Sequence, residues 1–149
     1  MTSRTGFRIA AVIFLLFAAG HTFGFLSFRP ATTEAQAVWN GMQNVRFGGT
    51  ATDVPRFSYG GFYLGFGLTI TAFMLFQGWL SWVCGEMASK GLPESRSIGL
   101  ALALLQVVGV VVSFKFFSAG PAVFSVMLVL LLGFCALRSP ARDRRPEAH

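Results

Sequence analysis

Five side chains that could do chemistry lie at the ends of long apolar runs. They are one imidazole, two phenols and two guanidinium groups: His21, Tyr59, Tyr63, Arg29 and Arg56. Each can donate a hydrogen bond, and both arginines carry a permanent charge. An amphiphile with an anionic head could bind among them, with its chain against the nearby phenylalanines. The residue types therefore predict binding of a lipid or another hydrophobic small molecule.

His21 allows two interpretations. It lies seven residues before Phe28, which places it about 10 Å below the end of the first apolar run. Its ring could hydrogen bond to a tyrosine or to a backbone carbonyl of a neighbouring helix, or it could face a ligand. A metal site is not expected, because no second His, Cys or carboxylate lies at ligand spacing.

Catalysis has weak support, and no cofactor is expected. The sequence contains neither a Gly-x-Ser-x-Gly motif nor a Walker loop. A bis-histidine haem is excluded by count, since the second histidine is His149 in the tail. An enzyme acting on a membrane-soluble substrate would depend on His21, Tyr59, Tyr63 and Arg56 alone, so it stays open only as an alternative.

The elements that carry these residues are predicted to cross a membrane. The chain of 149 residues is 54% hydrophobic and 12% charged, with a mean hydropathy of +0.62. About 20 apolar residues span a bilayer as a helix. Four runs approach that length: 7–28, 60–83, 98–114 and 121–137. The expected fold is an all-α, four-helix transmembrane bundle in a single domain, 1–138, followed by a basic tail, 139–149.

The basic residues indicate the orientation of the spans. Cytoplasmic segments carry an excess of Lys and Arg. Eight basic residues fall in the N-terminal segment, the second connection and the tail: Arg4, Arg8, Lys90, Arg96, Arg138, Arg142, Arg144 and Arg145. Four fall in the other connections: Arg29, Arg46, Arg56 and Lys115. Both termini are therefore expected in the cytoplasm. The net charge of +6 reports this topology and not a nucleic-acid partner.

The connection between the first two spans predicts one further helix. Thr33 and Gln36 fit a capping box, and apolar residues including Trp39 and Met42 follow at helical spacing. We expect a short amphipathic helix on the extracytoplasmic side, lying in the interface or over the bundle.

Two small-residue motifs predict close helix packing. Gly20 and Gly24 lie four residues apart in the first span, and Gly61 and Gly65 do so in the second. Such pairs let helix backbones approach. The alternative function is therefore a structural or accessory protein that pairs with a second copy or with another membrane subunit.

The absence of acidic residues from the predicted spans disfavours two classes of membrane protein. Glu86 lies just beyond the second span, and no Asp or Glu lies within any. Proton-coupled exporters of this size and four-span sterol isomerases depend on intramembrane carboxylates.

Three segments together resemble a family of small, uncharacterised four-span proteins of bacterial inner membranes. They are GHTFGFLSFRP, WNGMQ and SYGGFYLGFGL, which cover the first two spans and their connection. The resemblance implies a four-helix integral protein of that membrane and draws attention to His21, Tyr59, Phe62, Tyr63, Gly65 and Gly67. It implies no activity.

Overall fold

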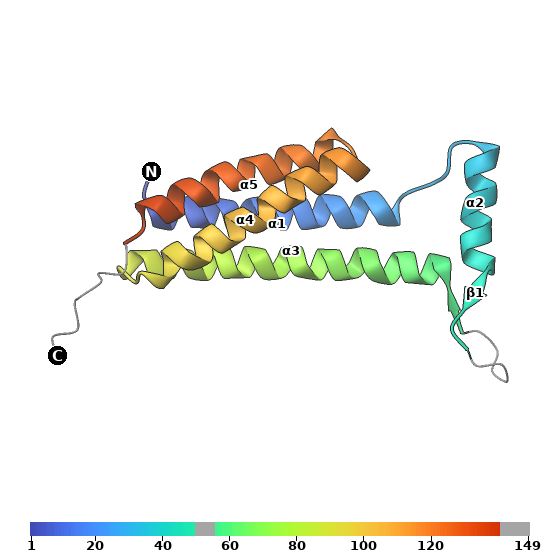
Figure 1. Ribbon diagram of the computed structural model, residues 1–149, viewed down its shortest axis with the longest axis horizontal. Coiled ribbons are helices and arrows are strands. Elements are labelled where there is room, and N and C mark those ends of the chain that lie inside the picture. Colours follow the sequence, from blue (N-terminus) through green and yellow to red (C-terminus); the bar gives the residue numbers. More distant parts are fainter. Residues whose placement is uncertain (50–55, 141–149) are drawn as a thin grey trace. The chain divides into compact units, whose positions relative to one another are not determined.

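The computed structural model describes residues 1–49 and 56–140, so residues 141–149 of the predicted tail lie outside the described residues. Five helices occupy the described chain (Figure 1): α1 (Ser3–Leu26), α2 (Thr33–Asn44), α3 (Tyr59–Ser89), α4 (Glu94–Phe116) and α5 (Ala119–Arg138). The predicted all-α class and the short helix between the first two spans are confirmed. The sequence did not predict one small addition, an antiparallel ladder of β1 (Arg46–Phe47) and β2 (Phe57–Ser58).

The four long helices coincide with the four predicted spans. Each is long and apolar enough to cross a membrane, with a mean hydropathy between 1.4 and 2.3 over its most apolar window. Helices α3, α4 and α5 extend beyond the predicted limits at both ends, most clearly α3, which continues from 83 to Ser89. Helix α1 begins before the predicted span 7–28 but ends at Leu26, two residues short of its predicted end. Within α3 no glycine or proline interrupts helical geometry. The helix ends before Gly91, whose φ of +72° is not helical, and Pro93 follows two residues later.

The chain forms two compact units. The first contains residues 1–17 and the described residues from 74 onward, and the second contains residues 18–73. Helices α1 and α3 contribute residues to both units.

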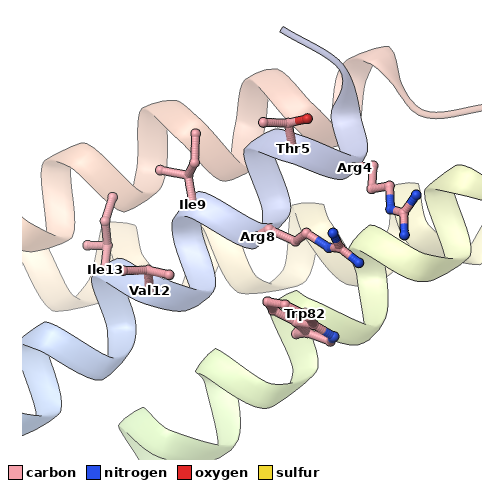
Figure 2. Close-up of a pocket in the computed structure, with 7 residues that line it drawn as sticks. All are labelled: Arg4, Thr5, Arg8, Ile9, Val12, Ile13 and Trp82. Carbon is pink, nitrogen blue, oxygen red and sulfur yellow. The ribbon is translucent and has the colours of Figure 1, made fainter.

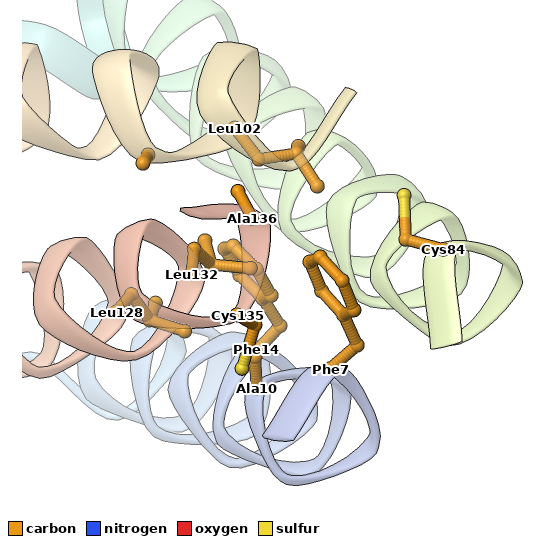
Figure 3. Close-up of a cluster of buried hydrophobic side chains, with 10 residues drawn as sticks. Phe7, Ala10, Phe14, Cys84, Leu102, Leu128, Leu132, Cys135 and Ala136 are labelled. Atoms are coloured by element: carbon orange, nitrogen blue, oxygen red, sulfur yellow. The ribbon is translucent and has the colours of Figure 1, made fainter. Parts of the chain in front are cut away.

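The first unit is a four-helix bundle with an apolar core. Figure 3 shows Phe7 and Phe14 of α1 beside Leu132 and Cys135 of α5, and all four side chains are fully buried. The core is completed by Ala10, Cys84, Leu102, Ala103, Leu128 and Ala136. Helices α4 and α5 pack along each other as a hairpin. Because membrane helices gain little from excluding water, their association depends on this close packing.

Polar side chains in the first unit pair within it. The buried Ser81 hydroxyl donates to the Phe7 carbonyl oxygen at 2.9 Å. The Gln106 amide donates to the Gln77 side chain at 2.7 Å and so links α4 to α3. These hydrogen bonds satisfy groups that would otherwise be costly in an apolar surrounding.

The amphipathic helix α2 begins one residue away from the predicted cap. The N-cap is Thr32, whose hydroxyl accepts a hydrogen bond from the Ala35 amide at 3.2 Å. Thr33 is the first helical residue, so the Thr33–Gln36 capping box does not form in this register. Thr32 and Thr33 carry the same hydroxyl group. Thr32 forms the cap because its backbone is extended, as an N-cap residue requires.

Candidate functional site

The second unit places the imidazole of His21 against the backbone of α3. Its Nε2 atom lies 3.2 Å from the Gly67 carbonyl oxygen, at hydrogen-bonding distance. The ring is tilted against Phe25, with 5.3 Å between ring centroids. In the described part of the chain, His21 makes no hydrogen bond or ring contact with either tyrosine. Of the interpretations open from the sequence, the hydrogen bond to a neighbouring backbone carbonyl is the one observed.

A pair of threonines joins the same two helices. The Thr22 and Thr71 hydroxyl oxygens lie 2.8 Å apart. Thr71 can also donate to the Gly67 carbonyl oxygen, and Thr22 to that of Ala18. Gly67 is buried, and a Cβ atom there would lie 3.0 Å from the Phe25 ring. Glycine thus allows α1 to approach closely enough for His21 to reach the carbonyl.

The two tyrosines occupy separate aromatic contacts. Tyr63 packs edge-on against Trp39 of α2, with centroids 6.2 Å apart, and Trp39 in turn contacts Phe28. Tyr59 packs on Phe47 of β1 at 4.8 Å. Tyr63 therefore helps to hold α2 against α3, and Tyr59 helps to hold the β ladder.

The two predicted arginines interact with nearby backbone. The Arg29 guanidinium donates to the carbonyl oxygens of Phe28 and Leu26, at 2.9 and 3.4 Å, near the end of α1. The Arg56 amide donates to the Gly48 carbonyl oxygen at 3.3 Å, and the Arg56 carbonyl accepts from Arg46. Both side chains remain exposed. No described contact gathers them with His21 and the tyrosines into one site.

Three of the four predicted packing glycines are open. A Cβ atom at Gly20, Gly24 or Gly65 would meet no atom of the described residues within 4 Å. At Gly61 it would lie 3.2 Å from the Ser58 hydroxyl, which accepts a hydrogen bond from the Gly61 amide.

The first unit contains a groove that the sequence did not predict as a site. Its volume is about 470 Å³, and it lies along one face of α1 opposite Trp82 of α3 (Figure 2). The lining residues of α1 are Arg4, Thr5, Arg8, Ile9, Val12 and Ile13. Their spacing of one, three and four residues is that of a single helix face. Sequence reasoning assigned Arg4 and Arg8 to topology alone, although their i, i+4 spacing was a usable signal.

Glu86 neutralises part of the charge beside this groove. Its carboxylate pairs with the guanidinium groups of Arg4, at 3.4 Å, and Arg8. The Arg8 guanidinium also lies over the Trp82 ring, 4.6 Å from its centroid. The Arg8 Nε atom is buried and has no hydrogen-bond partner in the part of the chain that the structure describes, an arrangement that typically costs about 1–3 kcal/mol. Two cations face one anion, so the groups retain a net positive charge.

Among the described residues, no cluster of three or more His, Cys, Asp and Glu side chains could hold a metal ion. Comparisons with protein-family models, curated proteins and solved structures found no match to this chain. The class assignment therefore depends on the fold. Four apolar helices of spanning length, packed as a bundle, indicate a multi-pass integral membrane protein in contact with the lipid bilayer.

The threonine bridge yields a test of helix pairing. Thr71→Val removes a hydroxyl that reaches across to α1, so we expect it to lower the stability of the protein in detergent by about 0.6–1.7 kcal/mol. The matched control is Thr69→Val, because the Thr69 hydroxyl donates to the Gly65 carbonyl oxygen of its own helix. The stability of each variant is measured as its unfolding midpoint in mixtures of mild detergent and dodecyl sulfate. Equal midpoints for the two variants would contradict a stabilising bridge.

Proposed function

We propose that the protein binds a lipid or another hydrophobic amphiphile within the membrane. The groove on α1 carries this proposal, because its lining changes from polar to apolar along the helix. Arg4, Thr5 and Arg8 line one end, and Ile9, Val12 and Ile13 line the other. Its volume lies in the range of small-molecule sites, about 300–1,000 Å³. An amphiphile likewise changes from a polar head to an apolar chain along its length.

The lipid site predicted on the extracytoplasmic side stays a prediction. It would use His21, Tyr59, Tyr63, Arg29 and Arg56 in the outer leaflet. Each of these residues already has a local contact in the second unit, and the groove has a more continuous lining. The groove is therefore the better-supported location for the same kind of ligand.

The membrane and the orientation are also proposals. The resemblance to four-span proteins of bacterial inner membranes and the distribution of basic residues favour that membrane, with both termini in the cytoplasm. The α1 groove would then open to the inner leaflet, because its polar end lies near the N-terminus.

The amphiphile proposal predicts that filling the apolar end of the groove displaces lipid. Ile9→Trp places an indole where an acyl chain would lie. If this costs binding about 1 kcal/mol, the fraction of protein that retains lipid on purification falls about fivefold. The control is Leu16→Trp, since Leu16 is an exposed residue of α1 that does not line the groove. Native mass spectrometry from gentle detergent measures bound lipid. An unchanged lipid fraction in Ile9→Trp would reject the groove as the site.

Orientation can be measured by cysteine labelling. Asn40 and Lys90 are exposed, in α2 and in the connection after α3, whereas the native Cys84 and Cys135 are buried. In intact spheroplasts, a membrane-impermeant thiol reagent should label Asn40→Cys and leave Lys90→Cys unlabelled until the membrane is opened. The reverse pattern would place the termini outside.

Open glycines favour a second candidate function, that of an accessory subunit. Gly65 precedes Gly67 by two residues, or about 200° around α3, so it faces away from the α1 contact of the second unit. Gly20 and Gly24 are open on α1. Exposed small residues allow a further helix to pack closely.

If this second function is correct, bulky side chains at these glycines should dissociate a complex. We expect Gly24→Leu and Gly65→Leu to reduce the particle mass in mild detergent to that of one chain. Gly133→Leu is the control, because a Cβ atom at Gly133, in α5 of the first unit, also meets no described atom within 4 Å. A native chain that is already monomeric would argue against the subunit.

A further inference from the structure

The polar end of the α1 groove has the charge to recognise one class of headgroup. Arg4 and Arg8 lie one helical turn apart, and their side chains are 46% and 37% exposed. Guanidinium groups match the geometry of phosphate oxygens, to which they can donate paired hydrogen bonds. The single carboxylate of Glu86 leaves one positive charge uncompensated. The remaining charge favours an anion over a zwitterion, whose own cation would lie beside the arginines.

The arrangement of the groove also fits a membrane lipid better than a free ion. Ile9 and Val12 are 42% and 50% exposed and continue directly from the arginines along α1. From Arg4 to Ile13 the helix rises about 13.5 Å, of which the apolar part from Ile9 to Ile13, about 6 Å, could follow the first part of an acyl chain. Trp82, 46% exposed, adds an amphipathic ring of the kind that favours the headgroup level of a bilayer.

Glu86 would compete with a phosphate for the guanidinium donors of Arg4 and Arg8. Its two carboxylate oxygens each take one arginine. Gly85 allows this contact, because a Cβ atom there would lie 3.2 Å from the Arg4 carbonyl oxygen of α1. The neighbouring residue of α3 therefore reaches both guanidinium groups. A phosphate that binds these groups must share them with the Glu86 carboxylate or replace it.

We propose that this groove is a site for an anionic phospholipid, in which Arg4 and Arg8 bind the phosphate and the apolar lining contacts an acyl chain. The inference rests on the proposed amphiphile-binding function and adds the headgroup class and the residues that select it. Glu86 limits the affinity of the site because it competes for the arginines.

A competition between two lipids tests the headgroup. The purified full-length protein is mixed with equimolar phosphatidylglycerol and phosphatidylcholine of identical chains, and native mass spectrometry gives the ratio of the two bound lipids. A basic residue near a membrane surface increases the affinity for an anionic lipid about fivefold. We expect a phosphatidylglycerol excess of about that size, and near-equal binding in Arg4→Gln.

Glu86→Gln separates recognition from structural support. Both Arg4→Gln and Glu86→Gln break the same ion pair, so a purely structural role would change lipid binding in the same direction. Competition predicts opposite changes, with a larger phosphatidylglycerol excess in Glu86→Gln. The charge control is Arg138→Gln, because Arg138 ends α5 beside Phe134 and does not line the groove. It should leave the ratio unchanged.

Each remaining outcome has a defined meaning. Equal binding of the two lipids, with loss of both in Ile9→Trp, would overturn the headgroup inference while the proposed function stands. If the native protein retains neither lipid, the proposed function fails as well. Displacement of bound lipid by inorganic phosphate alone would overturn the lipid assignment and identify an anion site. A lower phosphatidylglycerol ratio in Glu86→Gln would assign the arginines to a structural ion pair only.

Discussion

Polar groups in an apolar helical chain must find partners within the chain, and this constraint organises both units. A buried hydroxyl, amide or imidazole without a partner loses its hydrogen bonds to water and gains nothing in exchange. In the first unit, Ser81 reaches the carbonyl oxygen of Phe7, and Gln106 reaches Gln77. In the second unit, His21 reaches the carbonyl oxygen of Gly67. In each case the partner lies on another helix, so satisfying the polar group also specifies which helices pair.

Close approach of helices is the condition for these hydrogen bonds. A side chain as short as serine reaches a neighbouring backbone only when the two helices are nearly in contact. Small residues create that contact at defined points. Gly85 brings α3 against the backbone of Arg4, and Gly67 leaves room for the Phe25 ring. The same residue type at Gly24 and Gly65 has no such neighbour among the described residues, so small size alone does not make a helix contact.

The charge at the polar end of the α1 groove is incompletely balanced. Glu86 pairs with two arginines but can neutralise only one. Near a bilayer surface an exposed guanidinium is stable because its stem lies along apolar surface while its head meets lipid phosphates or water. Ordinary snorkelling and specific lipid binding therefore use the same groups. What would separate them is the adjoining apolar wall of Ile9 and Val12, which in the proposed complex contacts the acyl chain.

The amino-acid sequence by itself determined the number and limits of the long helices to within several residues. Length and hydropathy suffice for this, because the hydrocarbon core demands about 20 apolar residues per crossing whatever the partners. It also correctly indicated an amphipathic α2. Only tertiary structure decided the partners of the polar residues. His21 could have met a tyrosine. Instead, because Gly67 has no Cβ atom, α1 approaches α3 closely and the His21 ring lies within hydrogen-bonding distance of the Gly67 carbonyl oxygen. Likewise, Glu86 lies 82 residues from Arg4 and 78 from Arg8 in the sequence, so no local pattern reveals that it meets the two arginines. Helix formation depends on neighbours in sequence, whereas a site depends on which helix faces are brought together.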